Sequence, residues 1–149
     1  MLINIYVLLG TVNGLLRLTA NGTSYYENLS SEDRAALCDS IKRQLSQVIP
    51  VNLDRLSIHG KPQYDPSLES KQLLFRVEIK SAKTTGQRSV SKVLNDLKTL
   101  ILHKSITAVQ YYSSISMLDE TYGFTVAREY NNRSTLHQPP ALVINACII

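Results

Sequence analysis

The 149-residue chain is predicted to fold as an α+β domain in which two helices cover one face of an antiparallel sheet. The main observation is an amphipathic pattern in residues 89–103. Apolar side chains recur there at helical spacing along one stripe, and polar side chains occupy the opposite face. A one-sided helix needs a surface to lie on. Segments with period-two alternation flank it along the chain, so the expected surface is a β-sheet.

The first strand is expected near the N-terminus. Asn13-Gly14 lies between two apolar runs, and this dipeptide favours a hairpin turn because both turn positions need positive φ. We therefore expect either a hairpin at this point or an apolar leader followed by a single strand over residues 15–19. Asn21-Gly22 predicts the next turn, and residues 23–29 are expected to form a polar connection.

A first helix is expected to begin near Ser30. Ser30 and Asp33 approximate a capping box, and an acidic residue suits the positive end of the helix dipole. Pro50 ends the helix, because proline disfavours helical geometry in the residue before it. The apolar stripe between these limits consists of Ala36, Leu37, Ile41, Leu45 and Val48.

Two strands are expected after this helix, over residues 53–59 and 73–80, with a long proline-containing turn between them. In the first, Leu56 and Ile58 share one face, and Arg55 and Ser57 share the other. The second strand alternates most clearly. Its apolar face carries Phe75, Val77 and Ile79, and its polar face carries Arg76, Glu78 and Lys80.

The helix over 89–103 is followed by residues 106–117, which we expect to form a last long strand. Residues 121–126 predict a short extra strand around Gly123. The resulting order is β-α-β-β-α-β, which is the split βαβ order of the ferredoxin-like fold.

The ferredoxin-like domain is expected to span residues 15–126. Residues 1–14 then form an apolar leader or an extra hairpin strand, and residues 127–149 a partly irregular tail. No segment reaches the roughly 18–20 consecutive apolar residues that cross a bilayer. Cys38 is expected to be a small buried hydrophobe, and a Cys38–Cys147 disulfide stays open as the alternative.

The chain is mildly basic, with 16 Lys and Arg against 12 Asp and Glu, and its formal net charge is +4. These basic residues are scattered and form no stripe or run, so nucleic acid is not the expected partner. The polar face of the sheet is the candidate contact surface, formed by Arg55, Arg76, Glu78 and Lys80. The only aromatic residues near the strands that could stack bases are Tyr111 and Tyr112, so this face favours a protein partner over RNA.

No constellation in the sequence predicts catalysis, a metal site or a cofactor site. Asp119 and Glu120 point apart in an extended segment, and Asp65 has no evident carboxylate partner, so paired acid–base chemistry is not indicated. The helix dipole accounts for a histidine at the end of helix 89–103. The three histidines fall in different predicted elements: His59, His103 and His137.

Three N-glycosylation sequons lie in predicted loops or in the tail, at Asn21, Asn28 and Asn132. They favour a lumenal or extracellular setting, and a cytoplasmic setting is the alternative. The sequence names neither a partner nor an oligomeric state.

Residues 48–124 resemble the soluble domain of a family of fungal multi-pass membrane proteins whose activity is uncharacterised. The resemblance lies in the segments Val51–Leu56, Gln72–Val77, Ser89–Val93 with Asp96-Leu97, and Met117–Asp119 with Tyr122–Phe124. In that family transmembrane helices follow the domain, which implies an outward-facing module. This chain departs from the pattern at Thr125 and lacks those helices. We therefore expect either a truncated or soluble relative that reaches a membrane only through a missing segment, or a chain whose tail comes from a different exon.

The same order of elements is more distantly similar to SEA domains, which are extracellular. Many of these cleave themselves at a Gly-Ser bond, but the corresponding Glu69-Ser70-Lys71 lacks the glycine, so no cleavage is expected. Together these features predict a non-enzymatic interaction or ectodomain-type module. The alternatives are a cytosolic ligand-sensing or regulatory module of the same fold, and a weak nucleic-acid binder.

Overall fold

Five antiparallel strands and three α-helices are found in residues 10–127, the part of the chain that the computed structural model describes. The strands are β1 (Val12–Arg17), β2 (Leu56–Ile58), β3 (Gln63–Tyr64), β4 (Leu73–Ile79) and β5 (Phe124–Val126). The helices are α1 (Ala20–Glu27), α2 (Ser31–Val48) and α3 (Val90–Leu102). The predicted α+β class is therefore confirmed.

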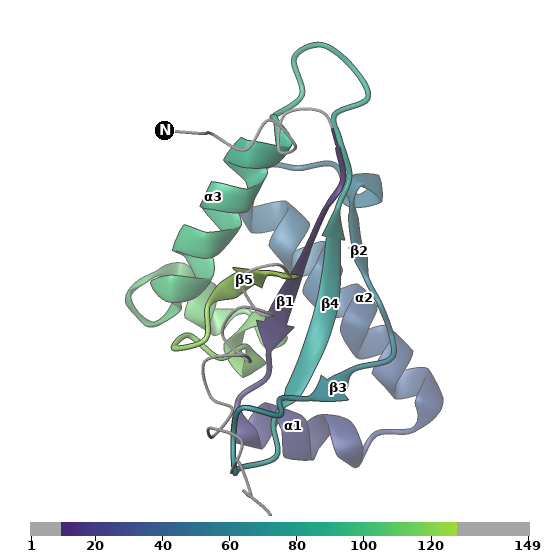
Figure 1. The fold of residues 1–149 in the computed structure, drawn as a ribbon, viewed down its shortest axis with the longest axis vertical. Coiled ribbons are helices and arrows are strands. Elements are labelled where there is room, and N and C mark those ends of the chain that lie inside the picture. The colour runs from purple at the N-terminus through teal and green to yellow at the C-terminus, as the bar shows by residue number, and fades with distance from the viewer. Residues whose placement is uncertain (1–9, 128–149) are drawn as a thin grey trace, which may run out of the picture.

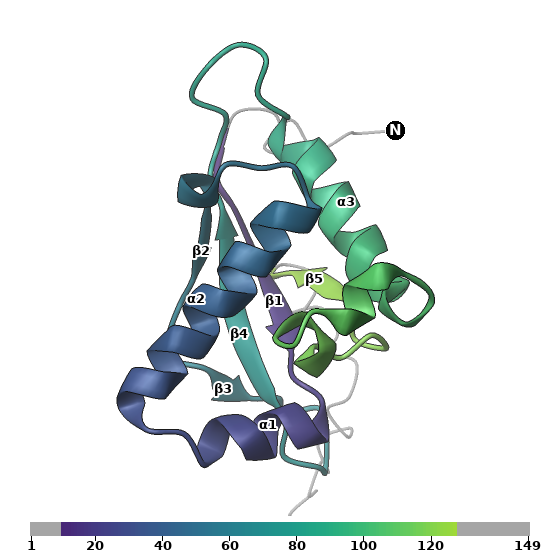
Figure 2. The ribbon, with the colours of Figure 1, turned by 180° about the vertical axis from the view of Figure 1, so that it is seen from behind.

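The sheet has the strand order β2-β4-β1-β5, and the two-residue β3 pairs with the start of β4 (Figure 1). Each of these pairings is antiparallel. Seen from behind, α2 crosses the strands on the side of β2 and β4, and α3 runs on the side of β5 (Figure 2). α1 lies across the end of the molecule below them.

The hydrophobic core lies between the sheet and the helices. Phe75, Val77 and Ile79 of β4 are buried as predicted, each exposing no more than 1% of its surface. The predicted stripe of α3 is also buried in this core, with Leu97 and Ile101 fully enclosed. Burial of these side chains is the main favourable term that holds the two helices on the sheet.

Both long helices begin where the sequence predicts. The Ser30 hydroxyl accepts a hydrogen bond from the Asp33 amide at 3.1 Å, which fixes the start of α2. The Ser89 hydroxyl accepts one from the Lys92 amide at 3.3 Å, which fixes the start of α3. The cap at the far end of α2 is Ile49, one residue before Pro50.

The predicted hairpin at Asn13-Gly14 is wrong, because both residues lie inside the continuous strand β1. Gly14 is needed there for packing and not for a turn. A Cβ atom built on Gly14 would lie 2.1 Å from the ring of Phe124, which crosses the strand at this point. The glycine therefore provides the space in which β5 packs against β1.

The turn predicted at Asn21-Gly22 and the polar connection after it are also wrong, because these residues form α1. The Thr19 hydroxyl accepts a hydrogen bond from the Gly22 amide at 3.0 Å and caps the helix. A Cβ on Gly22 would lie 2.9 Å from the carbonyl oxygen of Met117. Gly22 therefore allows α1 to pack closely on the chain that leads to β5.

The predicted last strand over residues 106–117 is wrong. The chain forms three short 3-10 helices there, η3 (Lys104–Ile106), η4 (Ala108–Tyr111) and η5 (Ile115–Met117). The Gln44 side chain of α2 accepts hydrogen bonds from the amides of Ser114 and Ile115, at 3.1 and 3.3 Å. The backbone amides of Ser114 and Ile115 thus bond to a side chain of α2 instead of to a neighbouring strand.

β5 takes the sheet position that residues 106–117 were expected to fill. It lies within the short strand predicted over 121–126, and it follows Gly123, whose φ of 67° suits glycine. Residues 1–9 of the predicted leader or hairpin strand (1–14) and residues 128–149 of the predicted tail (127–149) lie outside the described residues. Asn132, His137 and Cys147 are among them. Within the described residues, no helix combines the length and apolar character needed to cross a membrane.

Replacing Gly14 with alanine is expected to lower the free energy of unfolding by about 1–3 kcal/mol, because the added methyl group forces the Phe124 ring out of its place. Denaturant unfolding measures the change. Gly60→Ala is the matched control, since a Cβ there meets no atom within 4 Å and its φ is not positive. Equal losses in the two variants would contradict the packing role of Gly14.

Candidate functional site

The polar residues that the fold brings together most closely are Arg17, Asp65 and Asp119. Arg17 lies at the end of β1, Asp65 follows β3, and Asp119 precedes β5. The Arg17 Nη1 is 2.9 Å from Asp65 Oδ2, and its Nη2 is 2.9 Å from Asp119 Oδ2. We call these three residues the arginine triad; it joins three segments that are distant in sequence.

Each carboxylate of the arginine triad is held a second time by its own turn. Asp65 Oδ1 accepts hydrogen bonds from the amide and hydroxyl of Ser67, at 2.9 and 2.6 Å. Asp119 Oδ1 accepts the same pair from Thr121, at 2.9 and 2.7 Å. Sequence analysis missed this convergence, and the repeated Asp-x-Ser/Thr pattern was the only local signal of it.

The electrostatics of the arginine triad are those of a structural cluster. Burial raises the pKa of Asp65, but the Ser67 hydrogen bonds and the Arg17 charge outweigh it, so the pKa lies below its ordinary value. For Asp119 burial is likewise outweighed by the Thr121 hydroxyl and Arg17, and its pKa is lowered too. Both groups are held as carboxylates and are committed to bonds within the fold.

The prediction that Arg55 belongs to the contact face is wrong, because Arg55 is only 1% exposed. It is the last residue of a short 3-10 turn, η2 (Leu53–Arg55), and precedes β2, so it does not share the face of Ser57. Its Nε and Nη1 donate to the carbonyl oxygens of Lys80 and Arg88, at 3.1 and 2.8 Å. Arg55 therefore ties β4 to the start of α3.

The other three residues predicted on this face keep solvent access. Arg76 is exposed, and Glu78 and Lys80 are half-buried. Glu78 Oε2 lies 3.9 Å from His59 Nε2, which is at the end of β2. The exposed face of the sheet thus carries charge of both signs.

Residues 56–64 form one edge of the sheet, and we call them the edge ribbon. β2 and β3 at its two ends both pair with β4, and β2 is the outermost strand. Between the strands the side chains alternate between two hollows on opposite sides of the ribbon, and Gly60 borders both. The sequence prediction of a long irregular turn overlooked this alternation.

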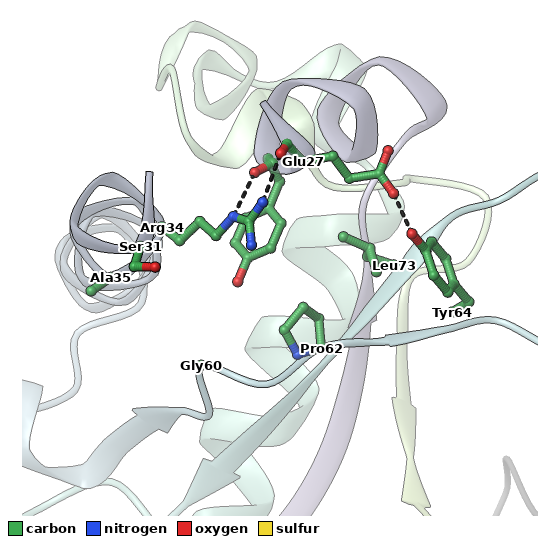
Figure 3. Close-up of a pocket in the computed structure, with 9 residues that line it drawn as sticks. Glu27, Ser31, Arg34, Ala35, Gly60, Pro62, Tyr64 and Leu73 are labelled. Atoms are coloured by element: carbon green, nitrogen blue, oxygen red, sulfur yellow. Dashed lines mark hydrogen bonds between the residues drawn. The ribbon is translucent and has the colours of Figure 1, made fainter. Parts of the chain in front are cut away.

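The first hollow is a pocket of about 450 Å³ between the edge ribbon and the helices α1 and α2 (Figure 3). We call it the tyrosine pocket. Pro62 and Tyr64 line it from the ribbon, and Tyr26, Glu27 and Arg34 line it from the helices. Figure 3 shows the hydroxyl of Tyr64 reaching across the opening to donate a hydrogen bond to the carboxylate of Glu27.

Arg34 forms one wall of the tyrosine pocket. It donates to the carbonyl oxygens of Tyr26 and Glu27, at 3.1 and 2.6 Å, and so satisfies the C-terminal end of α1. Its guanidinium carbon lies 5.1 Å from the centre of the Tyr26 ring. These two bonds engage two of the five guanidinium N–H groups, so the wall also offers donors.

The two tyrosines of the pocket differ in environment. Burial raises the pKa of Tyr26, whose ring meets Phe75 edge-on with centroids 5.3 Å apart. The hydrogen bond to Glu27 raises the pKa of Tyr64, which is 49% exposed. Tyr26 therefore belongs to the core, and Tyr64 is a half-exposed aromatic available for contact.

The second hollow, of about 540 Å³, opens on the face of the sheet away from the helices. We call it the face hollow. Leu15 and Leu74 supply its apolar surface. The polar side chains around it are His59, Lys61, Gln63 and Arg76. It therefore joins the predicted contact face to the edge ribbon.

The remaining predicted residues do not form a common site. His59 directly follows β2 and lines the face hollow, whereas His103 caps the C-terminus of α3, so these two histidines lie in different parts of the fold, as the sequence predicts. Cys38 is buried, and burial raises the pKa of its thiol. Within residues 10–127, no group of three or more His, Cys, Asp or Glu side chains is placed to hold a metal ion.

Two of the three sequon asparagines lie in the described structure. Asn21 is exposed in the first turn of α1, and Asn28 is exposed at its end, where the side chain donates to the Ser24 carbonyl at 2.8 Å.

Comparison of the chain with family models, curated proteins and solved structures finds no match.

Replacing Arg17 with methionine is expected to lower the free energy of unfolding by about 3–5 kcal/mol at neutral pH, because two buried carboxylates lose their shared cation. The parent protein should also lose stability in acid. Its triad carboxylates have folded pKa values below the ordinary 3.8, so their contribution is complete above that pH and disappears as the pH falls through the folded values. Denaturant unfolding over a pH series measures both effects.

The matched control is Arg88→Met, which removes an exposed ion pair with Asp96. Its cost is expected to be at most about 1 kcal/mol. The acid dependence of Arg17→Met should be shallower than that of the parent. A similar cost for the two variants, with unchanged acid dependence, would contradict the central role of the arginine triad.

Proposed function

We propose that this domain is a non-enzymatic interaction module that binds a polypeptide partner along the edge ribbon. The observation that carries the proposal is the pair of hollows on opposite sides of one sheet edge. An extended polypeptide places successive side chains on opposite sides, so the two hollows match its period of two. Addition of a peptide to a sheet edge is a common recognition mode, and side-chain pockets supply its specificity.

Tyr64 is the expected anchor of this contact. Its ring is half exposed, and its hydroxyl is positioned by Glu27. Tyrosine supplies a large amphipathic surface at a small cost in side-chain entropy, and so is frequent at binding hot spots. The paired carboxylates that the fold does create are taken up by Arg17, which supports binding over acid–base catalysis.

We further propose that the fold is ferredoxin-like and the setting extracellular or membrane-associated. With the short β3 set aside and the consecutive helices α1 and α2 counted as one helical segment, the observed elements run β-α-β-β-α-β, and the sheet order β2-β4-β1-β5 places the first and third of four strands at its centre. These features support the ferredoxin-like assignment. The exposed sequons Asn21 and Asn28, with the resemblance to fungal membrane-protein and SEA-type domains, support the setting.

The binding proposal is tested with a displayed library of random peptides selected on the full chain. Selected peptides are expected to shift the NMR amide signals of residues 56–64, and Tyr64→Ala should weaken their binding roughly tenfold or more. Tyr111→Ala is the matched control, because Tyr111 is 80% exposed on η4, outside the residues that line both hollows. Selected peptides that bind Tyr64→Ala and Tyr111→Ala equally well, or shift other regions, would refute the edge ribbon as the contact site.

The extracellular setting is tested by expressing the full chain behind a secretion signal in a fungal host. A mobility shift on treatment with an N-glycosidase is expected, and Asn28→Gln should remove one step of it because Asn28 is exposed at a helix end. Asn95→Gln, at an asparagine outside any sequon, is the control. A secreted product without glycan at Asn21 or Asn28 would count against this setting.

A further inference from the structure

We infer that the face hollow selects an acidic segment of the polypeptide partner, with a partner carboxylate held by Arg76 and Lys61. This inference rests on the proposed function, and it assigns the chemical class of the partner. Among the described residues that line the face hollow, none carries a carboxylate, whereas Lys61 and Arg76 are cations. An acidic side chain is the complement of that lining.

The geometry places these cations on two adjacent segments. Arg76 lies in the middle of β4, and His59 donates its backbone amide to the Arg76 carbonyl at 3.0 Å, so the two residues are neighbours across the sheet. Lys61 is exposed two residues further along the edge ribbon. Three carboxylates lie near this face. Glu78 is 3.9 Å from His59, further along β4 in the direction away from Lys61, and Asp65 and Asp119 are both paired with Arg17.

The apolar surface of the hollow strengthens a charge pair formed there. In the sheet register Leu15 is directly opposite Arg76, and Leu74, two residues before it, is only 5% exposed. A guanidinium beside apolar side chains is less fully surrounded by water, so its attraction for a carboxylate is screened less than at an open surface. Arg76 can also engage both carboxylate oxygens through parallel N–H groups.

An acidic peptide fits this hollow better than a nucleic acid does. The open faces of β1, β2 and β4 at this point carry Leu15, Ser57, Arg76 and Glu78. Among the described residues that line the hollow, the imidazole of His59 is then the only ring on which a base can stack. Glu78 would also repel a phosphate backbone that continues across the sheet. A short segment with one or two carboxylates avoids this repulsion.

The two hollows also differ in charge across Gly60. Glu27 lines the tyrosine pocket, and cationic side chains line the face hollow. An extended partner that crosses the edge ribbon therefore meets a cationic hollow on one side and a mixed aromatic pocket on the other. This asymmetry gives the partner one preferred orientation and register.

The test uses the full chain and three fluorescent probes: an oligo-glutamate peptide, a Gly-Ser peptide of equal length, and a single-stranded RNA. The glutamate peptide is expected to bind best, with an affinity that falls as salt is added. Arg76→Ala should weaken it roughly tenfold, and Arg76→Lys should lie between, because lysine keeps the charge but not the bidentate geometry. Circular dichroism checks that the variants stay folded.

Arg43→Ala is the matched control, since Arg43 is exposed on α2 and its loss changes the net charge equally. Equal weakening by Arg76→Ala and Arg43→Ala would overturn the inference, because only overall charge would then matter. Preferential RNA binding that depends on Arg76 would also overturn it. If library peptides bind the edge ribbon but are neutral or basic, the proposed function stands and the acidic preference fails; if none binds there, both fail.

Discussion

The arginine triad is the constraint on which the rest of the molecule depends. Arg17 ends the central strand β1. Of its two carboxylate partners, Asp65 directly follows the edge ribbon and Asp119 precedes β5. The guanidinium of Arg17 thus connects the central strand β1 to the segments that lead from β3 and into β5. Two buried carboxylates without Arg17 would repel each other, and Arg17 without them would be a part-buried charge lacking a counter-ion, so each charge is stabilised by the others. The arginine triad also holds the end of the edge ribbon in place, because Asp65 directly follows Tyr64.

The parts of the fold that could be predicted are those decided by local sequence. The stripe of α3, the cap at Ser30 and the alternation of β4 each depend on neighbouring residues only, and the structure agrees with all three. The failures depend on distant contacts. Gly14 is explained by a ring that arrives from residue 124, and the 3-10 run is held by the Gln44 side chain, so no local pattern indicates either.

The candidate site divides in the same way. Arg76 and Glu78 could be placed on the open face because strand alternation is a local property. Arg55 was misplaced because residues 53–55 of the predicted strand form a 3-10 turn, and the strand begins only at Leu56. The tyrosine pocket combines α1, α2 and the edge ribbon, and the first of these was predicted as a loop. Its assembly could not be foreseen until α1 was known to bring Tyr26 and Glu27 to this edge.

Gly60 has a consequence for how recognition at this edge can change. It is the one described residue that borders both hollows, and the space above its Cα is empty to 4 Å. A side chain at this position would separate the tyrosine pocket from the face hollow, and a larger side chain would separate them more. The surrounding core would not be disturbed. Under the proposed function, a single substitution at Gly60 would change the choice of partner at little cost in folding stability.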